Sequence, residues 1–261
     1  MKKVLNILII AGVLGYVFAA LSFTGAKNAE TVCRELRINL FDTLNSGFYK
    51  KADIEKILMS KGNYILGYPL KDINTRVLEK ALQKRPYIEK AEIYSSIDGV
   101  IQVDITQRKP VVRIITRSQN SYYLDKDGYI LPARGNFSPH VLIANGYFTE
   151  DNDLRNASNL SNLADSAKYS EWFDSLTLAA YISRNAFWNS QIVQLYFDRD
   201  HDFELIPRVG AHQIIFGDTG NMEGKFKKLK VLYDNGLKYE GWNSYEKINL
   251  KYKNQVICTK R

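Results

Sequence analysis

Cysteine and proline are scarce in this chain, whose 261 residues include two cysteines and six prolines. Two cysteines, Cys33 and Cys258, cannot build a disulfide scaffold or a cysteine-rich zinc site. The few prolines, together with 16 glycines, exclude a collagen-like or low-complexity architecture. The hydrophobic share of 45% and the charged share of 25% are instead typical of an ordinary globular protein. We expect each thiol to be unpaired or buried.

Signatures of the common catalytic and cofactor sites are also lacking. The chain has no G-x-S-x-G elbow, no P-loop and no glycine-rich dinucleotide fingerprint. His140, His201 and His212 show no metal-ligand spacing, and we expect them in loops or at the surface. We therefore predict a protein without catalytic residues, cofactors or metal ligands.

Two acidic segments are interpreted as surface loops. The aspartates of FDRDHDF, residues 197–203, alternate as in a calcium-binding loop, but Phe203 and Val209 occupy the positions that require Gly and Glu. A polar β-turn is the better interpretation. The acidic side chains of residues 150–153 are predicted to form a solvated loop.

The chain carries 36 Lys and Arg against 28 Asp and Glu, a net charge of +8. Such a charge is compatible with nucleic acid or anionic lipid, but it defines no partner by itself.

The longest apolar run, residues 4–23, contains no charged side chain. Twenty helical residues extend about 30 Å, the thickness of the hydrocarbon core of a bilayer. Lys2 and Lys3 precede the run, so the positive-inside rule predicts a cytoplasmic tail of residues 1–3 and an extracytoplasmic remainder. A cleavable signal peptide is the alternative, but its apolar core usually has only 7–15 residues. The extracytoplasmic location argues against nucleic acid as a partner.

Behind a small, polar stalk of residues 24–33, the next 75 or so residues predict a small α+β domain. Leu36, Ile38 and Leu40 alternate with polar residues as in a half-buried strand. Two helices follow, within residues 50–62 and 75–85, and Asn74 is suited to cap the second. Strands over 87–95 and 100–106 are joined by an Asp98-Gly99 turn. The predicted order is β-α-α-β-β, with the helices on one face of the sheet.

The region from Pro110 onward predicts a mixed β domain with flanking helices. Helices are predicted over 169–184 and 222–235, and Gly236 is suited to end the second. Residues 149–166 are predicted to form a polar loop. Short strands are predicted over 111–116, 121–124, 129–131, 141–144, 192–197, 203–207, 213–216, 246–252 and 255–259.

Over nearly its whole length the chain resembles the FtsQ/DivIB family of bacterial cell-division proteins. The likeness is carried by RPYIEKAEIYSSIDGVIQVDITQRKPVVRI (85–114), YYLDKDGYIL (122–131), residues 142–146, HQIIFGDTGNMEGKFKKLKVLY (212–233) and INLKYKNQVICT (248–259). The resemblance implies a bitopic, non-catalytic divisome scaffold at the septum, in the inner (plasma) membrane with its mass in the periplasm. The implied domains are a tail (1–3), a transmembrane helix (4–23), a stalk (24–33), a POTRA domain (34–109) and a C-terminal β domain (110–261).

A non-catalytic scaffold works through its surfaces, and the last predicted strand is a candidate. A strand at a sheet edge offers N–H and C=O groups that another chain can complete by β-augmentation. The resemblance implies pairing with FtsB/DivIC-like and FtsL-like bitopic coiled-coil division proteins. The implied contact residues are Tyr252, Lys253, Asn254, Gln255, Val256, Ile257, Cys258 and Thr259. We expect Val256 and Cys258 to face inward.

Two further surfaces are weaker candidates for binding. Lys225, Lys227, Lys228 and Lys230 are predicted to form an outward basic face, which is interpreted as a solvated helix surface. The hairpin of residues 87–106 offers a second possible contact with other divisome proteins.

Two other function classes remain open. One is a POTRA-containing chaperone or secretion component for outer-membrane or secreted proteins, which usually carries several POTRA units or a barrel. The other is a secreted hydrolase, which would require a cleaved N-terminus and a reactive cluster.

Overall fold

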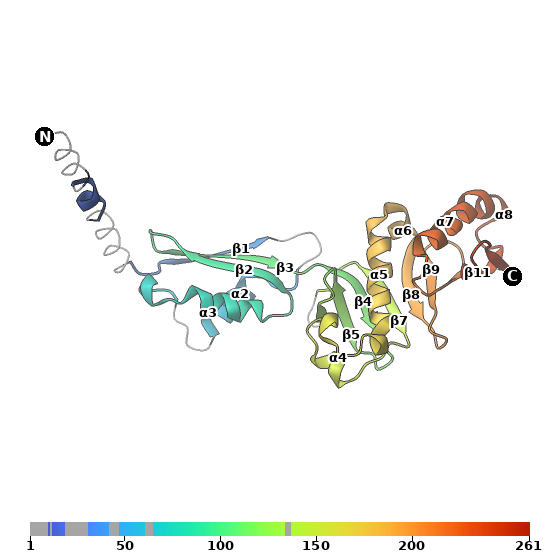
Figure 1. The fold of residues 1–261 in the computed structure, drawn as a ribbon, viewed down its shortest axis with the longest axis horizontal. Coiled ribbons are helices and arrows are strands. Elements are labelled where there is room, and N and C mark those ends of the chain that lie inside the picture. Colours follow the sequence, from blue (N-terminus) through green and yellow to red (C-terminus); the bar gives the residue numbers. More distant parts are fainter. Residues whose placement is uncertain (1–9, 11, 19–30, 42–46, 61–64, 134–136) are drawn as a thin grey trace. The chain divides into compact units, whose positions relative to one another are not determined.

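The computed structural model describes residues 10, 12–18, 31–41, 47–60, 65–133 and 137–261 (Figure 1). The chain divides into two compact units, one comprising residues 1–42 and 48–107, the other 43–47 and 108–261. Each unit has a hydrophobic core of its own.

Most of the predicted membrane segment, residues 4–23, lies outside the described residues, as does most of the stalk. The described part of the segment, Ile10 and residues 12–18, is helical. Its apolar side chains are exposed, 64% at Leu14 and 76% at Phe18. Among the described residues, no helix combines the length and the apolar character that crossing a bilayer requires.

The first unit is a three-stranded sheet covered by two helices, in the predicted β-α-α-β-β order. The central strand β3 pairs in parallel with β1 and antiparallel with β2. The elements are β1 (Glu35–Phe41), α2 (Lys51–Met59), α3 (Thr75–Gln83), β2 (Ile88–Ser95) and β3 (Val100–Gln107). A single turn of 3-10 helix, Leu70–Asp72, precedes α3.

The alternation along β3 separates the two faces of this sheet. Ile101, Val103 and Ile105 are fully buried in one core cluster with side chains of α2 and α3, so both helices pack on this face (Figure 1). On the opposite face Asp104 accepts a hydrogen bond from Asn39 at 2.8 Å. The predicted placement of the helices on one face of the sheet is therefore confirmed.

The second unit is built on a nine-stranded mixed sheet with the order β12-β11-β10-β9-β8-β7-β4-β5-β6. The pairs β4–β7, β7–β8 and β10–β11 are parallel, and the other neighbours are antiparallel. The first strands are β4 (Pro110–Ile115), β5 (Ser121–Asp125), β6 (Ile130–Pro132) and β7 (Leu142–Gly146). The others are β8 (Ile192–Phe197), β9 (Phe203–Pro207), β10 (Gln213–Gly217), β11 (Tyr245–Asn249) and β12 (Ile257–Lys260).

Helices cover one face of this sheet. Trp172, Leu178 and Phe226 are buried between helices and strands in one continuous core. The opposite face keeps half-buried side chains, such as Asn145 and Tyr196. The helices are α4 (Asn152–Asn156), α5 (Ser170–Arg184), α6 (Ala186–Gln191), α7 (Met222–Leu232) and α8 (Lys238–Glu240), with 3-10 turns at Leu160–Asn162 and Ala167–Tyr169.

Two local predictions in this unit are wrong. The predicted loop 149–166 contains α4 and a 3-10 turn, because Asp151 accepts the backbone N–H of Leu154 and starts a helix. Gly236 does not end α7, because a π-helical turn, Tyr233–Leu237, continues the helix into α8. The left-handed residue that follows is Gly241, with φ +94°.

Candidate functional site

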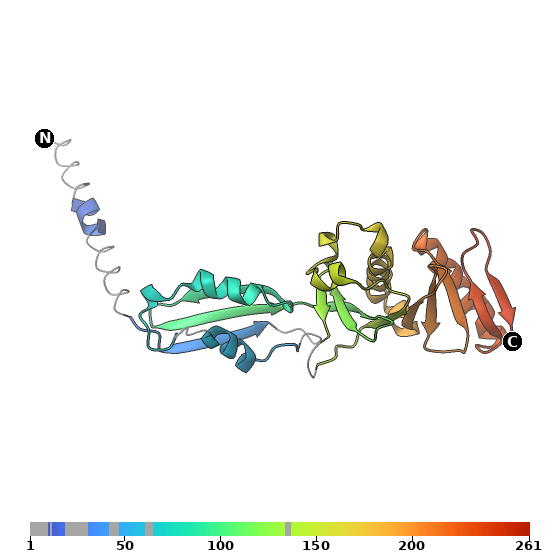
Figure 2. The same ribbon diagram turned by 90° about the horizontal axis from the view of Figure 1, so that it is seen from below.

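The last strand, β12, lies at one edge of the nine-stranded sheet, and it is the red strand next to the C-terminus in Figure 2. It pairs antiparallel with β11, with Thr259 opposite Lys247, Cys258 opposite Ile248 and Ile257 opposite Asn249. The other edge strand, β6, has three residues and ends in Pro132, which has no N–H to donate. Of the two edges, β12 is therefore the one suited to accept another strand.

The predicted contact residues form one continuous stretch at this edge. Ile257, Cys258 and Thr259 belong to β12, whereas residues 252–256 connect it to β11 through a turn at 253–254. Tyr252 and Ile257 expose 48% and 43% of their surface. Such exposed apolar side chains beside an open edge are what a docking strand would cover.

The inward side of the segment packs as expected. Val256 and Cys258 are half-buried and contact the core cluster of the second unit. Burial raises the pKa of the Cys258 thiol. The expected separation into an inner face with Val256 and Cys258 and an outer face with Ile257 is therefore confirmed.

The connection before β12 is tied to α7 by one ammonium group. Nζ of Lys228 donates to the carbonyl oxygens of Leu250 at 2.9 Å and Gln255 at 3.4 Å, and also to that of Tyr252. Burial, and then the charge of Lys225, lower the pKa of Lys228. These carbonyl groups face α7 and not a neighbouring strand, which is why β11 ends at Asn249 and β12 begins only at Ile257. The predicted bounds of 246–252 and 255–259 are corrected accordingly.

The predicted solvated lysine face of α7 is also wrong. Lys225 is only 7% exposed, and its Nζ lies 2.7 Å from an Asp218 carboxylate oxygen. Lys230 pairs with Asp234 at 2.6 Å, one helical turn further on. Three of the four lysines thus have partners within the unit, and Lys227 alone of the four is classed as exposed.

Glu150 lies at the centre of a polar cluster and not in a solvated loop. Its carboxylate accepts hydrogen bonds from Thr116 at 2.6 Å, Asn120 at 2.7 Å and Tyr122 at 2.8 Å. Arg155 adds an ion pair at 3.0 Å, and only 3% of the Glu150 side chain is exposed. Burial alone would raise the pKa of Glu150, but these donors together lower it to about 2.

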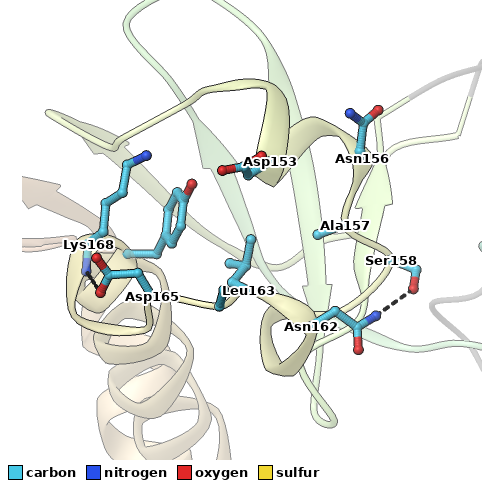
Figure 3. Close-up of a pocket in the computed structure, with 10 residues that line it drawn as sticks. Asp153, Asn156, Ala157, Ser158, Asn162, Leu163, Asp165 and Lys168 are labelled. Atoms are coloured by element: carbon cyan, nitrogen blue, oxygen red, sulfur yellow. Dashed lines mark hydrogen bonds between the residues drawn. The ribbon is translucent and has the colours of Figure 1, made fainter.

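A pocket of about 550 Å³ opens beside α4 and the following turns (Figure 3). Asp153, Asp165, Lys168 and Tyr169 bring titratable groups to its wall. These groups already make structural contacts: the Lys168 backbone N–H donates to Asp165 at 3.1 Å, and the Tyr169 hydroxyl bonds Asp151 at 2.7 Å. Lys168 also pairs with Asp151, whose pKa is lowered by the Leu154 N–H and by Lys168. The pocket offers polar lining but no nucleophile with an adjacent base.

His212 lies in a loop before β10, which is one of the two positions predicted for the histidines, but it is buried and not at the surface. It is 2% exposed, and its ring nitrogens lie 3.3 Å from the Trp242 carbonyl and 3.3 Å from the Tyr233 hydroxyl. Burial lowers the pKa of His212. Among the described residues, no group of three or more His, Cys, Asp or Glu side chains could hold a metal ion.

The segment 197–203 forms the predicted polar turn, between β8 and β9. Asp198 accepts backbone hydrogen bonds from Asp200 at 2.8 Å and Asp202 at 2.9 Å. Its carboxylate therefore shapes the turn.

Comparisons with known families match both units. The family model described as "FtsQ/DivIB, C-terminal related" matches residues 109–259, and the "POTRA-like domain" model matches residues 31–106. No curated protein matches the sequence. The first match covers more than half of the chain and includes the whole contact segment at 252–259.

Proposed function

The chain belongs to the FtsQ/DivIB family of cell-division proteins, and from that membership we propose that it is a non-catalytic scaffold of the divisome. It binds other septal membrane proteins through its extracytoplasmic units. The open edge at β12 is the observation that carries this mechanism.

The proposed contact is β-strand addition. Alternate N–H and C=O groups of an edge strand point away from its sheet, and a partner strand pairs with them. Lys228 holds the preceding connection in place, so the edge is ordered before a partner arrives. Pre-ordering reduces the conformational entropy lost on binding. Ile257 and Tyr252 supply apolar contacts beside the added strand.

The proposed partners are FtsB/DivIC-like and FtsL-like bitopic coiled-coil proteins, following the family resemblance. The segment that contacts them carries Lys253 and Lys260 and no acidic side chain between residues 250 and 261. A partner strand with acidic residues would therefore complement it.

The proposed location is the cell inner membrane at the division septum. Residues 4–23 form the single anchor, residues 1–3 stay in the cytoplasm, and both units lie in the periplasm. The twenty uncharged residues behind Lys2 and Lys3 support this topology.

The strand-addition site is tested by co-purification of the full chain with its division partners. Ile257→Pro and Ile257→Glu should abolish capture, because one disrupts the strand and the other places a charge beside the docking strand. Val231→Glu is the matched control, since Val231 is a 53% exposed aliphatic residue on α7. It should leave capture unchanged.

Circular dichroism of each variant checks that the fold survives. Unchanged partner capture by both folded Ile257 variants would refute strand addition at β12.

The cellular role is tested by depletion followed by microscopy. A divisome scaffold predicts filamentous, undivided cells. Normal septation together with defective outer-membrane assembly would instead favour the secretion class.

A further inference from the structure

Two arginine side chains flank one tyrosine ring on the second unit. The guanidinium carbon of Arg117 lies 4.7 Å from the centroid of the Tyr147 ring, and that of Arg199 lies 5.2 Å from it. Nε of Arg199 also donates to the Tyr147 hydroxyl at 2.5 Å. Both guanidinium groups thus contact the same phenol ring.

The cluster lies where three parallel strands end. Arg117 follows β4 by two residues, Tyr147 follows β7 directly, and Arg199 follows β8 by two residues. Because β7 pairs in parallel with both β4 and β8, these three carboxyl ends meet at one edge of the sheet. The crevice outside the carboxyl ends of neighbouring parallel strands is a recurrent place for ligands.

The backbone fixes the position of the Tyr147 ring. Gly146 has φ +123°, and a Cβ there would lie 2.1 Å from the Phe197 carbonyl oxygen. This close approach lets the Tyr147 N–H donate to the Phe197 carbonyl at 2.9 Å. The position of Tyr147 is therefore set by strand pairing and not by the arginines.

Neither guanidinium is paired with a carboxylate among the residues that the structure describes. Of the acidic residues near the cluster along the chain, the exposed Asp200 follows Arg199, and two others have roles of their own. Glu150 is held by Thr116, Asn120, Tyr122 and Arg155, while Asp198 accepts backbone N–H groups of its own turn. Two like charges on one ring repel each other, and an anion bound beside them would offset that repulsion.

A hollow of about 420 Å³ lies against the cluster. Its wall combines Arg117 and the rings of Tyr147 and Tyr196 with the apolar side chain of Ile115 and the amides of Gln119 and Asn145. The volume is within the range of about 300–1,000 Å³ found for ligand pockets.

We propose that this hollow binds an acidic side chain of an extended polypeptide, with Arg117, which lines it, holding the carboxylate and Arg199, which contacts the same tyrosine ring, adding positive charge beside it. The lining favours a peptide over a bare phosphate ion, because Ile115 and the tyrosine rings can contact methylene groups, and the amides can bond a peptide backbone. This second contact rests on the proposed role of the domain in binding polypeptides, but it is four strands away from β12 in the sheet.

The test measures fluorescence anisotropy of labelled peptides with the full chain in detergent micelles at low salt. The probes are an octapeptide of alternating Ala and Glu, the same peptide with Gln for Glu, and inorganic phosphate as a competitor. The Glu peptide should bind, the Gln peptide should bind at least about tenfold more weakly, and phosphate should compete poorly.

The matched variants distinguish peptide binding by the arginine–tyrosine cluster from attraction to the positive charge of the surface in general. Arg117→Gln with Arg199→Gln should weaken binding of the Glu peptide by about tenfold or more. Arg184→Gln removes an exposed arginine on α5 and should change it little. Capture of division partners by the double arginine variant would show that this variant is folded. Loss of partner capture in the Ile257 variants tests only the proposed function at β12 and leaves the peptide site untouched.

Equal binding of the Glu and Gln peptides, or no effect of the double variant, would overturn the proposal. Displacement of the Glu peptide by phosphate at equal concentration would assign the site to phosphate and overturn the peptide assignment.

Discussion

Glu150 illustrates at the scale of one residue how burial and hydrogen bonding oppose each other. Its carboxylate is buried, which disfavours the charge, but four donors favour the charge more strongly. Because its pKa in the folded chain, about 2, is below the ordinary value of 4.5, the stabilisation exists above the ordinary pKa. This stabilisation is lost as the pH falls through the pKa of Glu150 in the folded chain.

We therefore predict that Glu150→Gln lowers the free energy of unfolding at pH 7 by about 2–3 kcal/mol. The difference from the wild type should shrink as the pH falls from about 5 towards 2. Urea denaturation of both proteins at a series of pH values measures this difference in the free energy of unfolding. Glu223→Gln, at an exposed position in the first turn of α7, should have little effect, and a pH-independent deficit at Glu150 would contradict the interpretation.

Lys228 is predicted to order the edge strand. Lys228→Met keeps the apolar stem but removes the donor to the Leu250, Tyr252 and Gln255 carbonyls. Hydrogen exchange across residues 250–260 should become about tenfold faster, and partner capture should weaken. The neighbouring Lys227→Met is the control, since Lys227 is exposed. Equal protection of the segment in both variants would exclude this role for Lys228.

The sequence predicts single residues well where the cause is local. Asn74 accepts the Val77 N–H at 3.2 Å, as its place before an amphipathic helix indicates. The partners of Glu150 and Lys225 could not be predicted in this way. Thr116, Asn120 and Tyr122 lie 28–34 positions from Glu150, so only the folded sheet brings them together. An acidic loop and a lysine-rich helix are therefore misinterpreted as solvated.

At the scale of elements, the contact between β7 and β8 depends on one glycine. Gly146→Ala would force a Cβ to within 2.1 Å of the Phe197 carbonyl, at a φ of +123°. We predict a loss of about 3 kcal/mol or more in the free energy of unfolding.

The matched control for this prediction is Gly128→Ala. Gly128 also has a positive φ, +79°, but its nearest neighbour to an added Cβ is a side-chain oxygen at 3.4 Å. Strain alone should cost about 1–2 kcal/mol there. Equal losses at both glycines, measured by urea denaturation, would show that the steric contact contributes nothing.

Elements with strong alternation were predictable, and those that depend on tertiary contacts were not. The bounds of β8 and β9 agree with the prediction, because both strands combine apolar alternation with clear turns. The bounds of β11 and β12 differ because α7 engages the carbonyl groups between them. The continuation of α7 through Gly236 likewise depends on packing of Tyr233 and Leu237 in the core.

At the scale of the whole molecule, the α+β class and the two-part organisation could be expected from the order of patterns along the chain. The strand order of the nine-stranded sheet could not, because it places β7 between β4 and β8 across long connections. The candidate edge at β12 was predictable from the resemblance, whereas the arginine–tyrosine cluster was not. Its three side chains follow three different strands and meet only in the folded sheet.

The proposed membrane anchor makes a prediction for the mature protein. If residues 4–23 form a retained transmembrane helix, intact mass measurement of the purified chain should include them. Protease added to spheroplasts should digest both units and leave only the short N-terminal anchor protected. A mature chain that begins near residue 26 would identify a cleaved signal peptide instead.

The edge position of β12 also bears on what happens when partners are scarce. Two copies that paired their terminal strands around a twofold axis would use the same backbone groups of each edge. Such a pairing would bring together Lys260 of β12 and the nearby Lys253 from each copy, and like charges there disfavour it. The positive charge of this segment therefore disfavours pairing between two copies and favours a partner strand of opposite charge.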